Sequence, residues 1–545
     1  MKAKYLLTAA FSLALLSSCS DFLDVQPEGS PTTSQYFKND NQAIEAIDAL
    51  YAPIHQEGLF GREIFWEQGA ACDVVWGRTR GYSDLATFRY TGDESPLRTT
   101  YNNFTQVTSR ANWVIAKLLE KQAGTALTAV ETRSLGEAYF MRAFSHFYIA
   151  YRYGTDKQGV PFTRYEDYPD GYDNSIPKQQ ESVVDNYKYI IEDLDNAIKY
   201  LPKFEEYGAE DRGRAHKAAA VAYKAKVYAY WATWDKTQWN NVISMVNELE
   251  TTYGRDLAPN FDDVFSSDFA NFWTKEYLFG IAGTGGDTPG GSEFPGVILE
   301  NKGWGIYNGW GQNKPSYDIY EEMIKDGAGN DRIKRTLLEY GQEFEFFGET
   351  RKFFSTADVE SGFMINKYMD AFKKGYVSTN GDWPTSRVNM PLVRFAEMLL
   401  FRAEAYLATN HPDKAATDLN RLRTRAHLTP IAGNATWTDL YHERRCELAF
   451  EFTDHLYDLK RWFHAGNAEI KALAEKELNA HPRARHYADR GDCNSTFEIG
   501  AYEDYVNEAN PLVKAVKYDD HFIAFPYPST EITKSGGALK QNDGY

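Results

Sequence analysis

The sequence has few cysteines for its length and fewer basic than acidic residues. Four Cys occur among 545 residues, and none has the Cys-x-x-Cys spacing of a zinc ribbon or a thioredoxin-type redox site. Lys and Arg number 59 against 77 Asp and Glu, which gives a formal net charge of −18. Binding to nucleic acid without sequence preference relies on basic residues that neutralise phosphates, so the composition argues against this function.

Motifs of common enzyme classes are also missing. The sequence contains no G-x-S-x-G nucleophile elbow. The segment from His442 to Cys446 begins like the zinc motif H-E-x-x-H but ends in Cys, and Gly283-Thr-Gly-Gly lacks the Gly-Lys-Ser/Thr of a phosphate loop. Adjacent acids such as Glu321 and Glu322 are typical of a solvated helix face. We therefore predict that the chain is not an enzyme and needs no cofactor or metal.

Long apolar runs are absent after the first residues, so no membrane-spanning helix is predicted in the rest of the chain. The one apolar run, Tyr5–Leu16, follows Lys2 and Lys4 and has the proportions of a secretory signal. Leu16-Ser-Ser-Cys19 resembles the bacterial lipobox, which implies cleavage before Cys19 and a lipid anchor, palmitate included, on that residue. More than one acyl chain is what stable anchoring requires.

Two questions stay open, namely whether the cysteines form a disulfide and whether a group of aspartates binds calcium. Export would permit at most one disulfide among the remaining cysteines, which are Cys72, Cys446 and Cys493. A calcium ion is a further possibility at the loop acids Asp167, Asp170 and Asp173, although their spacing is not that of an EF-hand.

Aromatic residues are abundant, and most of them follow a helical period. Phe, Tyr and Trp number 33, 37 and 12, or 15% of the chain. Apolar positions recur at helical spacing over residues 128–153, 182–202, 214–231, 391–409, 412–427 and 437–463. Leu135-Gly136-Glu-Ala-Tyr139 matches the L-G-x2-Y core of a tetratricopeptide helix. The sequence therefore predicts a mainly α fold of tetratricopeptide-like helix pairs, with long irregular loops and little β structure.

Charged residues within these helices also show helical spacing. Arg394 and Glu397 are three residues apart, as are Arg444 and Glu447. Pairs at this spacing are neighbours on a helix surface, so we expect each pair to brace its own helix.

A different kind of sequence lies between residues 253 and 389. It is rich in Gly and Trp and has no strong periodicity. A region this long without regular structure is usually functional when it lies inside a compact protein. We therefore predict a binding region here, inserted into the helical scaffold.

Segments across the whole chain resemble the SusD/RagB family of Bacteroidetes outer-membrane nutrient-binding lipoproteins. They are CSDFLDVQP at 19–27, EAYFMRAFSHFY at 137–148, RFAEMLLFRAEA at 394–405, LNRLRTRA at 419–426, ERRCELAFE at 443–451, DLKRW at 458–462, FPYPSTE at 525–531 and QNDGY at 541–545. They include both ends of the mature chain and several of the predicted helices, and they occur in the family's order. Residues 253–389 are not among them.

The resemblance implies a SusD-like fold, a place on the cell surface and two kinds of partner. The chain would be lipid-anchored in the outer membrane through Cys19. It would capture an oligosaccharide or polysaccharide and deliver it to a SusC-like TonB-dependent transporter barrel. A peptide-binding member of the same family is the main alternative. A secreted glycoside hydrolase, which needs two carboxylates facing one cleft, is a weaker one.

Two clusters have the residue types that bind sugars, since flat rings cover the apolar face of a sugar and polar groups bond its hydroxyls. The first cluster contributes Asp73, Trp76, Arg78 and Tyr82, and the second contributes Trp304, Tyr307, Asn308 and Trp310. Single Trp residues are more often core anchors, whereas two such clusters together favour a ligand site.

The expected organisation is one mature domain. Residues 1–18 form the signal and 19–545 a single SusD-like domain. Within it we expect a helical scaffold at 36–252 and 390–465, the loop-rich region at 253–389 and a C-terminal family segment at 521–545.

Overall fold

The architecture is described for most of the chain by a computed structural model. It describes residues 36–67, 73–75, 82–168, 178–283, 310–311, 314–353, 361–375, 386–452, 454–488, 494–506 and 516–545. Cys19, Trp76, Arg78, Trp304, Tyr307 and Asn308 lie outside these residues, as do Cys72, Cys493, Asp170 and Asp173.

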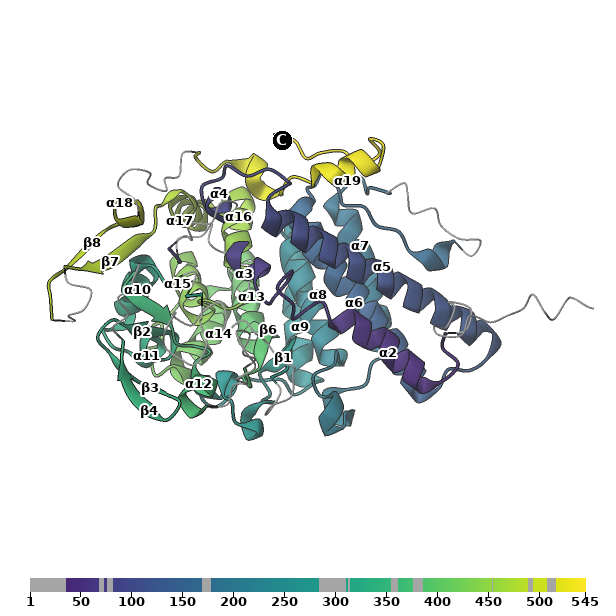
Figure 1. Ribbon diagram of the computed structural model, residues 1–545, viewed down its shortest axis with the longest axis horizontal. Coiled ribbons are helices and arrows are strands. Elements are labelled where there is room, and N and C mark those ends of the chain that lie inside the picture. The colour runs from purple at the N-terminus through teal and green to yellow at the C-terminus, as the bar shows by residue number, and fades with distance from the viewer. Residues whose placement is uncertain are drawn as a thin grey trace, which may run out of the picture.

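Helices dominate the described residues, which confirms the predicted fold class (Figure 1). The helices are α2 (Asp40–Tyr51), α3 (Glu63–Glu67), α4 (Tyr82–Ala86), α5 (Ser95–Gly124), α6 (Ala129–Tyr153), α7 (Val183–Tyr200), α8 (Lys217–Trp231), α9 (Trp239–Thr251), α10 (Tyr317–Met323), α11 (Asp331–Thr336), α12 (Asp370–Lys374), α13 (Phe395–Ala408), α14 (Pro412–Arg425), α15 (Trp437–Glu447), α16 (His455–Ala465), α17 (Ala468–Asn479), α18 (Tyr502–Val506) and α19 (Ser529–Lys534). Short 3-10 turns lie between them, among them η5 (Ala209–Asp211).

The strands form small antiparallel pairs. They are β1 (Tyr277–Ile281) with β6 (Met390–Arg394), β2 (Leu337–Glu339) with β5 (Phe363–Ile365), β3 (Glu343–Phe346) with β4 (Glu349–Lys352), and β7 (Arg483–Tyr487) with β8 (Phe497–Ala501). Figure 1 shows β2 to β4 with α10 to α12 at one end of the molecule, away from the long helices α5 to α7. The predicted irregular region thus contains short hairpins, which have a small core of their own around Phe346, Met364 and Phe372.

Consecutive helices pack as the predicted pairs. α5 packs on α6, α6 on α7, α7 on α8 and α8 on α9, and α9 then packs on α13, which packs on α14. Thr128 and Glu131 close a capping box at the start of α6. At Gly136 a Cβ would lie 2.8 Å from the backbone N of Leu201, so this glycine allows the end of α7 to approach α6. The L-G-x2-Y match therefore has a structural reason.

Two predicted helical stretches differ from the structure. Residues 390–394 form β6 because they pair with β1, and α13 begins only at Phe395. The stretch 437–463 is broken between α15 and α16, where Phe450 and Asp454 have positive φ angles of 63° and 58°. This break lets Glu451 reach Arg394 at the end of strand β6.

The expected pairs of Arg394 with Glu397 and of Arg444 with Glu447 are wrong, because Arg394 and Glu447 pair with residues from other parts of the chain. The Arg394 guanidinium lies 2.6 Å from Glu276 and 2.9 Å from Glu447, and its Nε lies 2.6 Å from Glu451. All four side chains are buried. Burial of a guanidinium requires several carboxylates around it, and these come from distant parts of the chain.

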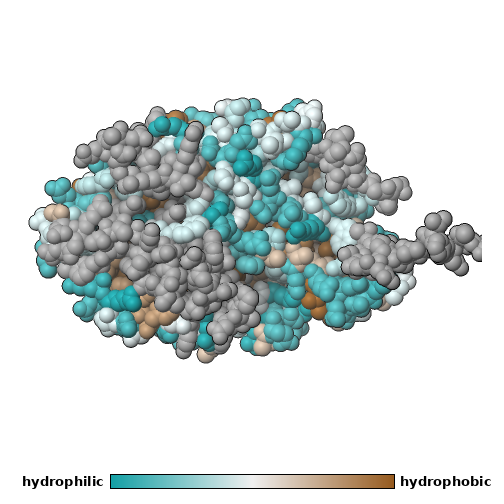
Figure 2. Space-filling model, in the orientation of Figure 1, coloured by the Kyte–Doolittle hydropathy of each residue, from teal (hydrophilic) through white to brown (hydrophobic). Residues whose placement is uncertain are grey.

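One hydrophobic cluster joins residues from Phe37 near the start to Leu539 near the end. The C-terminal segment runs over the helices, where Asn542 donates hydrogen bonds to the carbonyl oxygens of Tyr153 and Phe525 at 2.8 and 2.7 Å. None of the helices in the described part of the chain combines the length and apolar composition needed to cross a bilayer. On the face seen in Figure 2 most of the coloured surface is hydrophilic, with small hydrophobic areas between.

Candidate functional site

A short backbone pairing joins the start of the first predicted cluster to the segment that follows the second. Val74 and Pro315 form an antiparallel bridge. The Val75 N–H donates to the Lys314 carbonyl at 2.8 Å, and the Ser316 N–H donates to the Asp73 carbonyl at 2.9 Å. Segments about 240 residues apart in sequence are therefore side by side, as expected if they build one site.

An aromatic pair is formed by two residues close in sequence to this junction, Trp66 before Asp73 and Trp310 before Lys314. The rings of Trp66 and Trp310 are stacked, with centroids 6.4 Å apart and an interplanar angle of 27°. Trp66 is only 5% exposed, whereas Trp310 is 36% exposed and is one of the few large hydrophobic side chains on the surface of the described residues. The pair thus combines a buried ring with a ring open to solvent, which is the arrangement of a stacking platform.

Arg62 contacts both rings of this pair. Its guanidinium lies 4.8 Å from the centroid of Trp66 and 5.7 Å from that of Trp310, within the range of a cation–π contact. Glu57 and Glu63 form ion pairs with Arg62, the second at 2.8 Å. A charged donor is therefore held beside the exposed ring, where it can bond a hydroxyl of a ligand.

Sequence reasoning missed Trp66 and Arg62. Trp66 belongs to α3, a five-residue helix in which every side chain is buried. The one available signal for Trp66 was its place ten residues before Trp76, in front of a glycine-containing stretch. A single short helix gives no periodicity, so the residue could not be separated from an ordinary core tryptophan.

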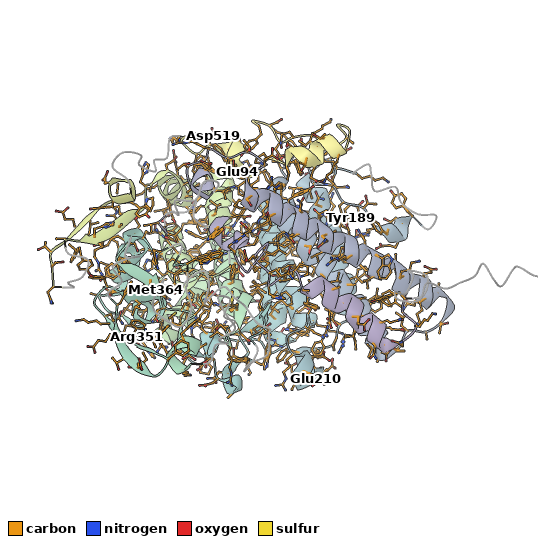
Figure 3. The ribbon with its side chains drawn as sticks, in the orientation of Figure 1. Glu94, Tyr189, Glu210, Arg351, Met364 and Asp519 are labelled. Carbon is orange, nitrogen blue, oxygen red and sulfur yellow. The ribbon has the colours of Figure 1, made fainter. Side chains whose placement is uncertain are left out.

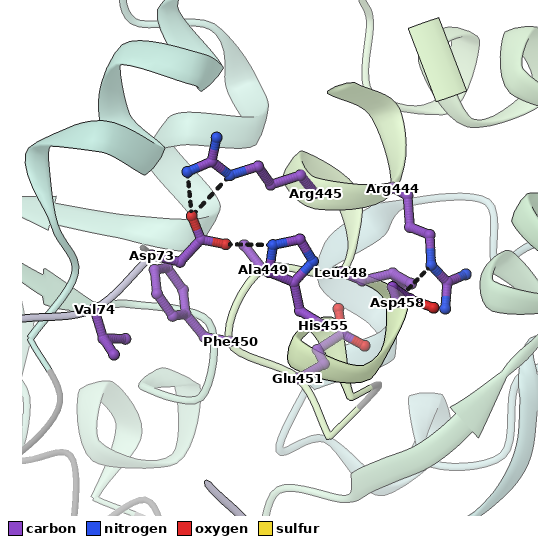
Figure 4. Close-up of a pocket in the computed structure, with 10 residues that line it drawn as sticks. All are labelled: Asp73, Val74, Arg444, Arg445, Leu448, Ala449, Phe450, Glu451, His455 and Asp458. Carbon is purple, nitrogen blue, oxygen red and sulfur yellow. Dashed lines mark hydrogen bonds and ion pairs between the residues drawn. The ribbon is translucent and has the colours of Figure 1, made fainter. Parts of the chain in front are cut away.

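Asp73 is placed in a buried ion-pair network behind the junction (Figure 4). Its Oδ1 accepts from Nε of Arg445 at 2.8 Å and lies 2.6 Å from Nη2, and its Oδ2 lies 3.4 Å from Nε2 of His455. The cavity beside these groups measures about 20 Å³, which leaves space for no more than a water molecule. The geometry favours an anchoring role for this carboxylate over direct contact with a ligand.

Glu477 completes the network around His455. Nε2 of His455 lies 2.7 Å from its carboxylate, and Arg445 lies 3.5 Å from it. Burial alone would lower the pKa of His455, but Glu477 and Asp73 together raise it. Burial would likewise raise the pKa of Glu477, but Arg445 and His455 lower it to about 2.

This network is the one group of His and acidic side chains in the described residues with ligand atoms close enough for a metal ion. The atoms of Asp73, His455 and Glu477 lie within 4.8 Å of one another. However, the Arg445 guanidinium is already paired with both carboxylates and supplies the positive charge. We therefore interpret the group as an ion-pair network.

The remaining predicted residues are only partly placed. Tyr82 begins α4, whereas Trp76, Arg78, Trp304, Tyr307 and Asn308 lie outside the described residues. Cys446 is buried in α15 and is a free thiol. His442, at the start of the zinc-like segment, instead lies 2.7 Å from Glu322 and 2.9 Å from Asp326.

Comparison with known families agrees with this architecture. A sequence profile of the SusD family matches residues 209–545, more than half of the chain. The chain belongs to the SusD family. A second profile, described as starch-binding associating with outer membrane, matches residues 21–229.

Individual relatives and solved structures are similar over nearly the whole chain. SusD-like protein P2 of Formosa agariphila is 27% identical over 84% of this SusD-family chain and 90% of its own length. A SusD-like protein from Bacteroides fragilis has the same fold with a TM-score of 0.73, at 19% identity over 94% and 98% of the two chains. A laminarin-binding SusD-like protein matches with a TM-score of 0.68, at 21% identity over 93% and 100%.

A surface glycan-binding protein A from Bacteroides uniformis also matches with a TM-score of 0.68. Its identity is 21%, over 92% of this chain and 99% of its own. At these identities the structural likeness establishes the fold, and ligand specificity has to be argued from the side chains.

Proposed function

We propose that this SusD-family protein is a surface glycan-binding lipoprotein. It captures an oligosaccharide or polysaccharide and delivers it to a SusC-like TonB-dependent transporter. The observation that carries the proposal is the stacked Trp66–Trp310 pair with Arg62 beside it, since Trp310 belongs to the second predicted cluster and Trp66 precedes the first in sequence. Relatives named for laminarin and glycan binding support the same ligand class.

The platform suits a sugar because it offers both parts of sugar recognition. The exposed ring of Trp310 presents a flat apolar face, and the Arg62 guanidinium supplies hydrogen-bond donors next to it. The ring is already stacked on Trp66, so little conformational entropy is lost when a sugar binds. Trp76, Arg78, Tyr82, Trp304, Tyr307 and Asn308 remain predicted members of this site.

The binding test uses the mature chain 19–545 with Cys19→Ser, which removes the lipid but keeps every other residue. Its affinity is measured by calorimetry for a panel of neutral polysaccharides, acidic polysaccharides and peptides. We expect binding to a glycan, and we expect Trp310→Ala to weaken it at least about tenfold, as truncation of a central aromatic anchor does. Trp310→Phe should retain part of the affinity.

Phe497→Ala is the matched control. Phe497 is 44% exposed and also lies beside an arginine, Arg485, at 5.2 Å, but it belongs to β8 at the far end of the molecule. It should leave affinity unchanged. Equal affinities for the wild type and Trp310→Ala would contradict the site, binding of peptides alone would favour the peptide-binding alternative, and reducing ends that increase with time would favour a hydrolase.

Anchoring and delivery have their own tests. Cys19→Ser should move the protein from the outer-membrane fraction to the soluble fraction and abolish its labelling with palmitate. Cross-linking of the wild type in intact cells should capture a TonB-dependent barrel. A wild-type protein that stays soluble, or that captures no barrel, would contradict this part of the proposal.

A further inference from the structure

A cleft beside α2 is lined by residues other than those of the Trp66–Trp310 platform. It is formed by α2, the turn after η5 and strand β1, and its volume is about 770 Å³. Ligand sites typically measure about 300–1,000 Å³, so the cleft has room for two or three sugar rings. None of the residues that line it belongs to the platform.

One wall of the cleft is aromatic and held in place. Trp273 is partly buried, and its ring makes an edge contact with Tyr277 at 5.0 Å and a tilted contact with Phe204 at 6.1 Å. A Cβ on Gly213 would lie 3.1 Å from the Cβ of Ala282, so the turn is packed directly onto the end of β1. The wall is therefore already formed before any ligand binds.

The polar groups at the cleft fall into two sets. Arg214 already has partners, since it pairs with Asp48 at 2.8 Å and with Asp211 at 2.7 Å. His55, Glu210 and Arg212 also line the cleft, and these side chains have no hydrogen-bond or ion-pair partner among the described residues. Figure 3 shows Glu210 at the outer edge of the molecule, below α2.

The charges of this second set nearly cancel. Arg212 and Glu210 are exposed and of opposite sign, and burial lowers the pKa of His55, which keeps its imidazole neutral near pH 7. A neutral imidazole both donates and accepts a hydrogen bond. The cleft thus offers an apolar wall, donors and acceptors without net charge, which matches an uncharged polyhydroxyl ligand better than an acidic one.

We propose that this cleft is a second saccharide-binding site, in which a neutral sugar stacks against Trp273 while His55, Glu210 and Arg212 bond its hydroxyls. The proposal rests on the proposed function, because it assigns a second contact for the same class of ligand. Two sites on one chain would hold a long glycan more tightly than either site alone, through the high effective concentration of the second contact.

The test uses the same lipid-free mature chain and hexasaccharides prepared from each neutral and each acidic polysaccharide of the panel. We expect two binding events per chain in the wild type and one in Trp310→Ala. Trp273→Ala, and separately Arg212→Ala on its exposed turn, should weaken the other event at least about tenfold. Arg212→Ala covers the possibility that loss of the Trp273 ring disturbs folding.

Trp234→Ala is the control, since Trp234 is a partly buried tryptophan that packs against His464 outside both sites. It should leave both events unchanged. A single event that Trp310→Ala abolishes and Arg212→Ala leaves intact would overturn the second site while the proposed function stands. If only acidic oligosaccharides bind the cleft, the neutral ligand class is wrong, and if the wild type binds no glycan, both proposals fail.

Discussion

Arg394 and Arg62 both lie against aromatic rings, but their surroundings differ. Arg394 is buried in the helical scaffold, 5.7 Å from the Phe261 ring, and three carboxylates surround it. Arg62 lies at the Trp66–Trp310 platform, where its side chain is 22% exposed and it contacts the ring of Trp310. The same pair of residue types therefore holds helices together in one region and presents a surface in the other.

The difference teaches how substitutions in the two regions should be measured. In the scaffold, a lost charge leaves buried partners unpaired, so the effect appears in the free energy of unfolding. At the Trp66–Trp310 platform, solvent replaces the contacts of a truncated side chain, so the effect appears in ligand affinity. Predictions that separate these two quantities test the comparison directly.

The largest effect is expected for Arg394→Met. The variant leaves Glu276, Glu447 and Glu451 with one guanidinium fewer, and breaking a buried ion pair typically costs roughly 3–5 kcal/mol. Urea unfolding should show a lower midpoint with an unchanged slope. Arg351→Ala, which removes an exposed pair with Glu349 at 3.6 Å, should change the free energy of unfolding by less than about 0.5 kcal/mol. Similar values for the two variants would break the comparison.

An intermediate case is Asp73→Asn, because Asp73 belongs to both regions. Its carboxylate is held by Arg445 in the scaffold, and its backbone pairs with Ser316 next to the binding face. We expect a loss of about 1–3 kcal/mol in stability, since Arg445 becomes partly unpaired, and also a several-fold loss in glycan affinity. Calorimetry and urea unfolding of one preparation measure both.

The control for Asp73→Asn is Asp195→Asn, which removes an exposed pair with Lys224 at 2.6 Å on the scaffold. It should change neither quantity beyond error. If Asp73→Asn lowers stability and leaves affinity intact, the carboxylate is a scaffold residue only. The anchoring role for the binding loops is then wrong.

The scaffold was largely predictable because its determinants are local. Helical periodicity and the Thr128 capping box act within a few turns, so the predicted helices 128–153 and 182–202 agree with α6 and α7. The strand β6 was not predictable in this way. It depends on pairing with β1, more than a hundred residues earlier in the sequence.

The site was predictable only in outline, because its contacts are non-local. Two clusters were recognised by composition, and their common site stays a prediction; the structure adds that Val74 of the first pairs with Pro315, five residues after Trp310. The burial of Asp73 could not be foreseen, since its partner Arg445 is 372 residues away in sequence. Trp66 was missed for the same reason, because only its stacking on Trp310 distinguishes it from a core residue.

The smallest expected effect is a pH dependence that comes from His455. Its partners Glu477 and Asp73 raise its pKa in the folded protein above the ordinary value of 6.5, against the effects of burial and of Arg445. A group with a raised folded pKa binds its proton more tightly in the folded state. Its contribution to stability is therefore complete below about pH 6.5 and is lost as the pH rises through the folded pKa.

The measurement is the free energy of unfolding in urea between pH 6 and pH 9 for the wild type and for His455→Gln. Gln keeps a hydrogen bond to Glu477 but does not titrate, so the difference between the two proteins should be largest at the acidic end and shrink as the pH rises. Because Asp73 faces the same imidazole, glycan affinity should weaken over the same pH interval in the wild type and stay flat in the variant. A wild-type excess in stability that is constant from pH 6 to pH 9 would mean that His455 stays in one protonation state throughout, and the ion-pair network would then be a fixed anchor, insensitive to pH, between the scaffold and the binding face.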